Sequence, residues 1–144
     1  MLIGEFTHTL DTKKRLAIPA KFRKEIGERA IITRGFDKCI VLYPFKQWEI
    51  LIQKLGELSL GQSDSRSLTR SLVGGATEVE FDSLGRILIP DHLKRYAELF
   101  QKVVVVGVAN RLEIWDAGQW ERYRKNIESK TDDLAEKLGE LGVL

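Results

Sequence analysis

The first residues of the chain alternate between apolar and polar side chains. Residues 6–10 follow this alternation, which is typical of a strand with one buried face. A short polar stretch over residues 11–14 comes next, and a second apolar run occupies residues 15–18. The pattern predicts a β-hairpin whose turn lies at residues 11–14.

Proline and helical spacing indicate the elements that follow. Pro19 stands where its fixed φ suits the first turn of a helix, so a short helix is predicted over residues 22–26. Two apolar runs, residues 30–33 and residues 40–43, predict two more strands. Aromatic and leucine side chains at helical spacing predict a closing helix that begins at Phe45.

The same series of elements occurs twice along the chain. Residues 4–19 align without a gap onto residues 75–90, an offset of 71, and a one-residue insertion later Gly35 aligns with Gly107. The second copy is predicted to contain a helix over residues 92–96 that Pro90 introduces as Pro19 does the first, strands over residues 103–108 and 112–115, and a closing helix around Trp120. The unit is therefore β-β-α-β-β followed by a helix.

Two such units predict a mainly β fold with helices, of the α+β class, in which two tandem β-β-α-β-β half-domains complete each other. We expect the first repeat over residues 4–50 and the second over residues 75–122. Between them lies a helical, serine-rich connector over residues 51–74, and a C-terminal helix or tail occupies residues 123–144.

Composition narrows the class of protein. The chain has 144 residues, 43% of them hydrophobic, which is enough for one domain with a real core. The single cysteine, Cys39, excludes an internal disulfide and is expected to be a buried structural thiol. No apolar window approaches about 18 residues and the N-terminus does not resemble a signal peptide, so a soluble cytoplasmic protein is expected.

Charge is balanced overall and segregated locally. The net charge is +2, yet residues 11–29 contain seven basic and three acidic residues, whereas residues 128–144 contain five acidic and two basic residues. One interpretation is a basic working surface with an acidic tail, and the other is ordinary solvated helix faces.

Catalytic and metal-binding patterns are missing from the sequence. His8 and His92 occupy different positions of the repeat and have no second ligand at metal spacing. The pair Gly74 and Gly75 precedes a strand and does not open a helix, as a phosphate-binding loop would. We therefore expect no metal, no cofactor, no small-molecule substrate and no enzymatic activity.

One polar motif recurs in both repeats, at the turn of each predicted hairpin. It consists of an aspartate and, four residues later, an arginine: Asp11 with Arg15, and Asp82 with Arg86. In one interpretation the aspartate stabilises the turn and the arginine pairs with it. In the other, each turn presents a guanidinium that binds phosphate or reads guanine in DNA.

Neighbouring residues separate these interpretations in part. Lys13 and Lys14 give the first turn three consecutive cations with Arg15, which a purely structural turn does not need. We therefore expect Lys13, Lys14 and Arg15 to bind DNA, whereas both interpretations remain open for Arg86. Asp11, Asp82 and Gly85 are expected to shape the turns, with Gly85 free to adopt positive φ.

The repeated motif, followed by Leu-Ala-Ile-Pro at residues 16–19 and Ile-Leu-Ile-Pro at residues 87–90, closely resembles the MraZ family of bacterial transcriptional regulators. The resemblance extends to about residue 129. It implies two SpoVT-AbrB-type domains in a swapped-hairpin β-barrel and a homo-oligomeric ring. It also implies binding to double-stranded DNA at direct repeats in the promoter of the division and cell-wall gene cluster that the gene heads, as a repressor associated with the nucleoid.

Two positions depart from the family pattern. Lys14 stands where the family often has glycine, so Lys14 is expected either to adopt positive φ or to change the turn. Leu84 stands where a polar residue is more usual, which makes a DNA contact by the second turn depend mainly on Arg86.

Two other functions remain as alternatives. AbrB-type barrels also occur in antitoxins, so a protein-interaction module is the second candidate, although such a protein is expected to have one barrel half and a disordered tail. A purely structural ring-forming protein is the third, and it leaves the cations of the first turn unexplained.

Overall fold

The computed structural model describes all residues, 1–144, as an α+β fold with one large and one small antiparallel sheet. The first repeat forms β1 (Leu2–Thr9), β2 (Arg15–Ala17), α1 (Ala20–Ile26), β3 (Arg29–Arg34), β4 (Ile40–Pro44) and α2 (Phe45–Gly56). The second repeat forms β5 (Thr77–Glu80), β6 (Arg86–Leu88), α4 (Asp91–Tyr96), β7 (Lys102–Ala109), β8 (Leu112–Asp116) and α5 (Ala117–Glu128). Two further helices, α3 (Ser63–Gly74) and α6 (Thr131–Glu140), follow the two repeats.

The strands of each repeat pair with strands of the other. The large sheet has the order β1-β7-β8-β4-β3-β5, and β2 pairs with β6 in the small sheet. The prediction of a hairpin within residues 6–18 is therefore wrong, because β1 pairs along its length with β7 and not with β2. A local pattern predicts strands and a turn but not the distant strand that supplies the hydrogen bonds. The exchange of partners agrees with the swapped arrangement that the family resemblance implies.

An approximate two-fold axis relates the two repeats. In the small sheet Leu16 faces Ile87, and exchanging the repeats exchanges these two residues. In the large sheet β4 pairs with β8, and the pairs Ile40–Ile114 and Leu42–Leu112 map onto each other in the same way. These registers confirm the offset of 71 at the turns and an offset of 72 at the last strands.

The alignment of Gly35 with Gly107 is wrong by one residue. Gly35 N donates to Cys39 O at 2.8 Å, and the residue that makes the corresponding bond in the second repeat is Val108, whose N donates to Arg111 O at 3.0 Å. The two glycines relieve different crowding: a Cβ on Gly107 would lie 2.7 Å from the Ile3 nitrogen, and one on Gly35 2.7 Å from Cys39 Sγ. The internal alignment of the two repeats pairs Gly35 with Gly107 because both are glycines, although the connection between the last two strands differs in length between the repeats.

One hydrophobic core contains side chains from both repeats and from both the small and the large sheet. Twenty buried residues form it, and Leu16, Phe22, Ile87 and Leu93 are among its least exposed side chains. A smaller cluster on another part of the large sheet contains Cys39, whose thiol is fully buried as predicted. Burial raises the pKa of the Cys39 thiol to about 12, so it is protonated and unreactive at neutral pH.

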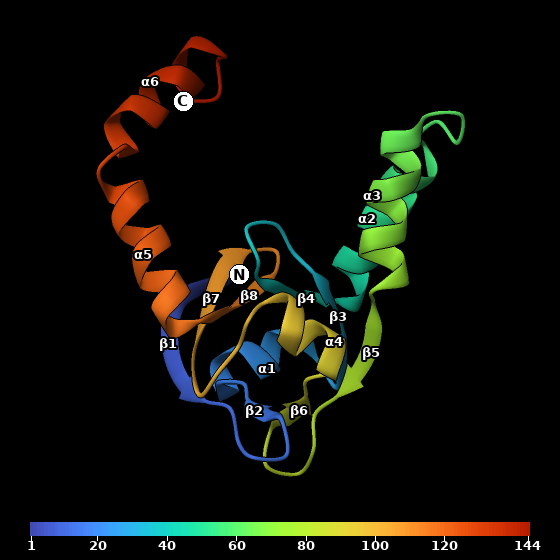
Figure 1. Cartoon of the computed structure of the whole chain (residues 1–144), viewed down its shortest axis with the longest axis vertical. Helices are drawn as coiled ribbons and strands as arrows, with labels where there is room; N and C mark the ends of the chain where they lie inside the picture. Colours follow the sequence, from blue (N-terminus) through green and yellow to red (C-terminus); the bar gives the residue numbers. More distant parts are fainter.

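Helical arms extend from one end of the barrel. In Figure 1, α2 and α3 form one arm and α5 and α6 the other, and the β1–β2 and β5–β6 turns lie at the opposite end. The predicted closing helices correspond to α2 and α5, and α6 lies within the predicted C-terminal helix or tail. Pro19 and Pro90 directly precede α1 and α4, as predicted. No helix combines the length and the apolar character that crossing a membrane requires.

Candidate nucleic-acid interface

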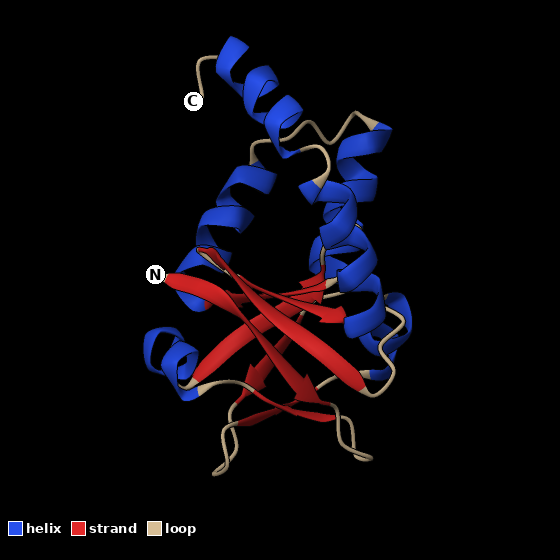
Figure 2. Cartoon of the chain, turned by 90° about the vertical axis from the view of Figure 1, so that its left-hand side faces the viewer, coloured by secondary structure: helices blue, strands red, loops and turns tan.

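The two turns that contain the repeated motif lie next to each other. Figure 2 shows both loops protruding from the same end of the barrel, below the sheets. Hydrogen bonds cross between them: Ile18 N donates to Gly85 O at 3.0 Å, and Ile89 N donates to Lys14 O at 2.8 Å. The strand swap thus brings together two segments that are 71 residues apart in the sequence.

Each aspartate of the motif organises its own turn. Asp11 Oδ1 accepts hydrogen bonds from the backbone nitrogens of Lys13 and Arg15, both at 2.8 Å, and Asp11 Oδ2 accepts from Arg15 Nε at 2.9 Å. Asp82 makes the same three bonds at 2.8–2.9 Å, to the nitrogens of Leu84 and Arg86 and to Arg86 Nε. The bond from the Arg15 backbone, and from the Arg86 backbone in the second turn, lowers the pKa of each aspartate, so both are ionised at neutral pH.

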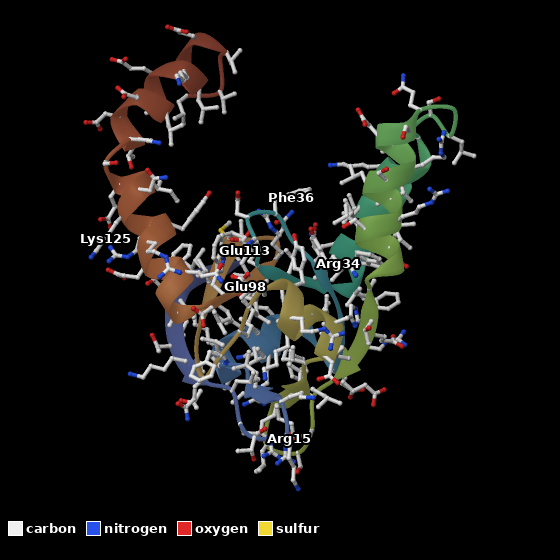
Figure 3. The ribbon with its side chains drawn as sticks, viewed as in Figure 1. Arg15, Arg34, Phe36, Glu98, Glu113 and Lys125 are labelled. Carbon is white, nitrogen blue, oxygen red and sulfur yellow. The ribbon has the colours of Figure 1, made fainter.

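The two arginines share the outward face of the small sheet. Side chains alternate along a strand, and because Leu16 and Ile87 are buried, Arg15 and Arg86 point away from the core. Their side chains are 33% and 26% exposed. Figure 3 shows Arg15 at the end of the molecule opposite the helical arms.

Pairing through Nε leaves part of each guanidinium available. No acceptor in the chain bonds to the Nη atoms of Arg15, whereas Arg86 Nη1 lies 3.8 Å from Asp11 Oδ2. Asp11 therefore faces both arginines and links the two turns electrostatically. An arginine held by Nε keeps its Nη donors in a fixed orientation, which favours bidentate recognition of phosphate or guanine.

The two lysines of the first turn differ in their surroundings. Lys13 is exposed at the tip and forms no ion pair. Lys14 adopts a φ of 62°, which confirms the expectation of positive φ at this position, and its Nζ pairs with Asp91. That ion pair lowers the pKa of Asp91, so the carboxylate partly neutralises Lys14 in the free protein.

Two residues near the turns were not predicted from the sequence. Asp91, 77 residues after Lys14, begins α4, and nothing in its spacing indicated the ion pair. Arg23 of α1 lies against the second turn, where a Cβ on Gly85 would be 2.5 Å from Arg23 Cζ, and Arg23 Nε donates to Ile18 O at 2.9 Å. The excess of basic residues over positions 11–29 was the only signal for Arg23.

A cavity and a histidine contact are the other features that could form a site, and the cavity borders the second turn through Arg23 and Phe81. A cavity of about 680 Å³ lies near the junction of α1, β3 and β5, and its lining includes Lys24, Arg29 and Glu80. His92 Nε2 lies 3.0 Å from Gly75 O, a structural contact. No cluster of three or more histidine, cysteine, aspartate or glutamate side chains is arranged to hold a metal ion.

The fold and the turns define a class: a two-repeat α+β protein whose interlocked halves present a pair of aspartate-anchored arginines at one end. A family model described as "MraZ protein, putative antitoxin-like" matches residues 1–71 and again residues 72–140. The chain is also similar to proteins called "Transcriptional regulator MraZ" in three bacteria. It is 49% identical over 96% of the chain and 97% of the relative in Limosilactobacillus reuteri (strain DSM 20016). The identity is 44% over 96% of both chains in Natranaerobius thermophilus, and 44% over 99% of the chain and all of the relative in Clostridium tetani.

The chain belongs to the MraZ family. The family is one of transcriptional regulators and not of enzymes. This membership confirms the resemblance drawn from the repeated motif.

Proposed function

We propose that this protein is a sequence-specific DNA-binding regulator that represses its own division and cell-wall gene cluster. It contacts double-stranded DNA through the turns at residues 11–15 and 82–86. The observation that supports this most is the swapped pairing, which places Arg15 and Arg86 on one outward face, in diagonal positions of two paired strands. The relatives named as transcriptional regulators support the same class of function.

The geometry of the small sheet suits the major groove. The groove admits a two-stranded β-ribbon, and arginine there binds the O6 and N7 atoms of guanine. We assign Arg15 and Arg86 to base edges, because Asp11 and Asp82 hold their Nε atoms and leave Nη donors to point outward. Lys13 and Lys14 directly precede Arg15 in the first turn and are assigned to phosphates.

Binding to direct repeats requires several copies in the same orientation. Head-to-tail contacts between identical subunits relate them in this way and close into a ring where the rotation allows it. Exposed apolar side chains on both arms favour such contacts, among them Leu60 and Leu138. The proposal therefore includes a homo-oligomeric ring that resides in the cytoplasm and associates with the nucleoid.

A binding experiment tests the proposal. Fluorescence anisotropy with the DNA upstream of the protein's own gene, and with a shuffled control of equal length, is measured across a salt series. We expect much tighter binding to the upstream DNA, with affinity that falls as salt rises. Equal affinity for both duplexes would contradict sequence-specific binding, and a reporter gene that is more active with the protein present would contradict repression.

A protein-interaction module of the antitoxin type is the second candidate, which the description of the family model favours. The helical arms would supply its interaction surface. An antitoxin of this kind is expected to contain one barrel half and a disordered tail, whereas this chain has two repeats and a helix, α6, near its end. Tight binding of a partner protein without any binding of the upstream DNA would favour this candidate.

A further inference from the structure

The two turns end in different chemistry at equivalent positions. Leu84 is the counterpart of Lys13, because the offset is 71 and the backbone nitrogen of each donates to the Oδ1 atom of its aspartate. Leu84 is 67% exposed. On the outward face of β6, Leu88 is 59% exposed, and its counterpart on β2 is the smaller Ala17. The second turn is therefore apolar where the first turn is basic.

The position of Leu84 is fixed by the turn. Its nitrogen donates to Asp82 Oδ1 at 2.9 Å, and the same Oδ1 atom accepts from the nitrogen of Arg86. One carboxylate thus holds both the backbone that carries the apolar side chain and the candidate base-reading arginine. A single exposed leucine is common on protein surfaces, but this one stands beside Arg86, at the tip that the proposed function directs into DNA.

The major groove offers one apolar group to such a side chain. Each thymine presents its C5-methyl group there, and apolar side chains recognise thymine by contact with that methyl. We infer that Leu84 contacts the C5-methyl group of a thymine adjacent to the base read by Arg86, an inference that rests on the proposed function. The first turn then reads DNA through cations, and the second through an arginine and a methyl contact.

The different side chains at the two tips distinguish the two orientations in which the protein can lie on DNA. Two identical tips related by a two-fold axis would bind a DNA element equally well in either orientation. Lys13 at one tip and Leu84 at the other make the orientations unequal, and direct repeats require each subunit to bind in the same orientation. Leu84 is therefore a specificity-determining residue that also orients the subunit on DNA.

Replacing thymine with deoxyuracil removes only the C5-methyl group and tests the contact directly. Each thymine of one operator element is replaced in turn, and binding of the parent and of Leu84→Ala is measured. For the parent we expect one thymine whose replacement weakens binding about fourfold, the value of one buried methyl-sized group. For Leu84→Ala the same replacement should have no effect, because the contact is already lost.

Three further variants isolate the effect. Leu84→Met keeps an apolar contact and should keep the preference for thymine over deoxyuracil. Leu84→Lys gives the second tip a lysine at the position of Lys13, so it should bind random DNA more tightly and steepen the salt dependence by about one unit. Phe36→Ala removes an apolar side chain that is 67% exposed, as Leu84 is, in the connection between β3 and β4 at the end of the molecule opposite Arg15 (Figure 3), and should leave the ratio of affinities for thymine and deoxyuracil unchanged.

The outcomes separate this inference from the proposed function. If the parent binds the operator and every deoxyuracil replacement affects the parent and Leu84→Ala equally, the methyl contact is refuted while DNA binding stands. If the parent binds no upstream DNA at all, the proposed function fails and this inference fails with it. Unchanged melting and sedimentation of Leu84→Ala would show that its loss of thymine preference comes from the contact.

Discussion

The turn at Asp11–Arg15 and the turn at Asp82–Arg86 share a skeleton and differ in surface chemistry. Both use an aspartate to hold two backbone nitrogens and an arginine Nε, and both rest on the same pair of swapped strands. The first has lysines at its tip, and the second has Leu84 and Gly85. The aspartate bonds to backbone atoms, so the tip side chains are free to differ while the fold stays the same.

Only one tip position is restricted by the backbone. Lys14 has a φ of 62° and its counterpart Gly85 a φ of 76°, so both turns require left-handed geometry at this point. Glycine adopts it without strain, whereas lysine does not. The first turn therefore keeps a strained lysine where a glycine would be more stable, and the ion pair with Asp91 offsets part of that strain.

The largest expected effects on stability come from the buried residues of the small sheet, where the two repeats are alike. Leu16→Ala and Ile87→Ala should each lower the free energy of unfolding by about 2–5 kcal/mol, because both side chains are almost fully buried and face each other across the two-fold axis. Urea unfolding measures this, and one cooperative transition is expected in both variants. Two separate transitions, one for each repeat, would contradict a shared core.

Backbone conformation at the tip should give smaller effects of opposite sign. Gly85→Ala should destabilise by about 1–2 kcal/mol, because its φ is positive and the new Cβ would displace Arg23 from Ile18 O. Lys14→Gly should stabilise by less than about 1 kcal/mol, since relief of strain is partly offset by loss of the ion pair with Asp91 and by glycine's greater entropy when unfolded. Gly56→Ala, in α2 with open space around it, is the control and should stabilise slightly. Destabilisation by Lys14→Gly as large as that by Gly85→Ala would show that the strain argument is wrong.

The lysines should differ in their contribution to salt-dependent DNA binding. Lys13→Ala should reduce the slope of log affinity against log salt by about one unit. Lys14→Ala should reduce it less, because Asp91 already pairs with Lys14 in the free protein. Asp91→Ala should strengthen binding to random DNA by freeing Lys14. Equal slopes for the two lysine variants would mean that the ion pair does not persist in solution.

Low pH should reduce the stability that both turns contribute, and the contribution of the first turn should fall slightly more. The pKa values of Asp11 and Asp82 are lowered in the folded protein, mainly by the backbone bonds from Arg15 and Arg86. A carboxylate with a lowered folded pKa stabilises the protein at neutral pH, and this stability is lost as the pH falls below about 4. Asp11→Asn and Asp82→Asn should therefore show a smaller drop in Tm between about pH 5 and pH 3 than the parent does.

The difference between the turns sharpens this measurement. Asp11 also lies 3.8 Å from Arg86 Nη1, and no corresponding contact joins Asp82 to Arg15, so Asp11→Asn should flatten the pH profile more. The profile of Tm against pH, recorded for all three proteins, checks this expectation. Identical profiles would show that neither aspartate contributes to stability in acid.

The sequence predicted the elements well because each has a local cause. Periodicity located the helices and strands, prolines indicated the starts of α1 and α4, and the repeat showed that two units exist. The partners of β1 and β2 could not be predicted from these patterns, because hydrogen bonding to β7 and β6 depends on segments far away in the chain.

The candidate site could be predicted in part from the sequence, because some of its interactions are also local. The repeated aspartate and arginine were visible, since each pair acts within five residues. The neighbours that modify them, Asp91 beside Lys14 and Arg23 beside Gly85, come together only through the fold. Repeats alone also misplaced Gly35 by one residue, because crowding, and not a common position, requires each glycine.

The most direct test of the central claim is to remove the Arg15 guanidinium and measure binding and stability on one preparation. Arg15→Ala is compared with the parent for operator affinity, random-DNA affinity, Tm and sedimentation. Arg15→Lys is measured beside it, because lysine retains the charge but not the two parallel donors of the guanidinium. We predict that Arg15→Ala stays assembled and folded while its operator affinity falls by about 5- to 150-fold, the value of 1–3 kcal/mol for one bidentate base contact, and its random-DNA affinity falls less. An Arg15→Ala protein that assembles and melts like the parent and binds the operator as tightly would exclude the first turn from the DNA site.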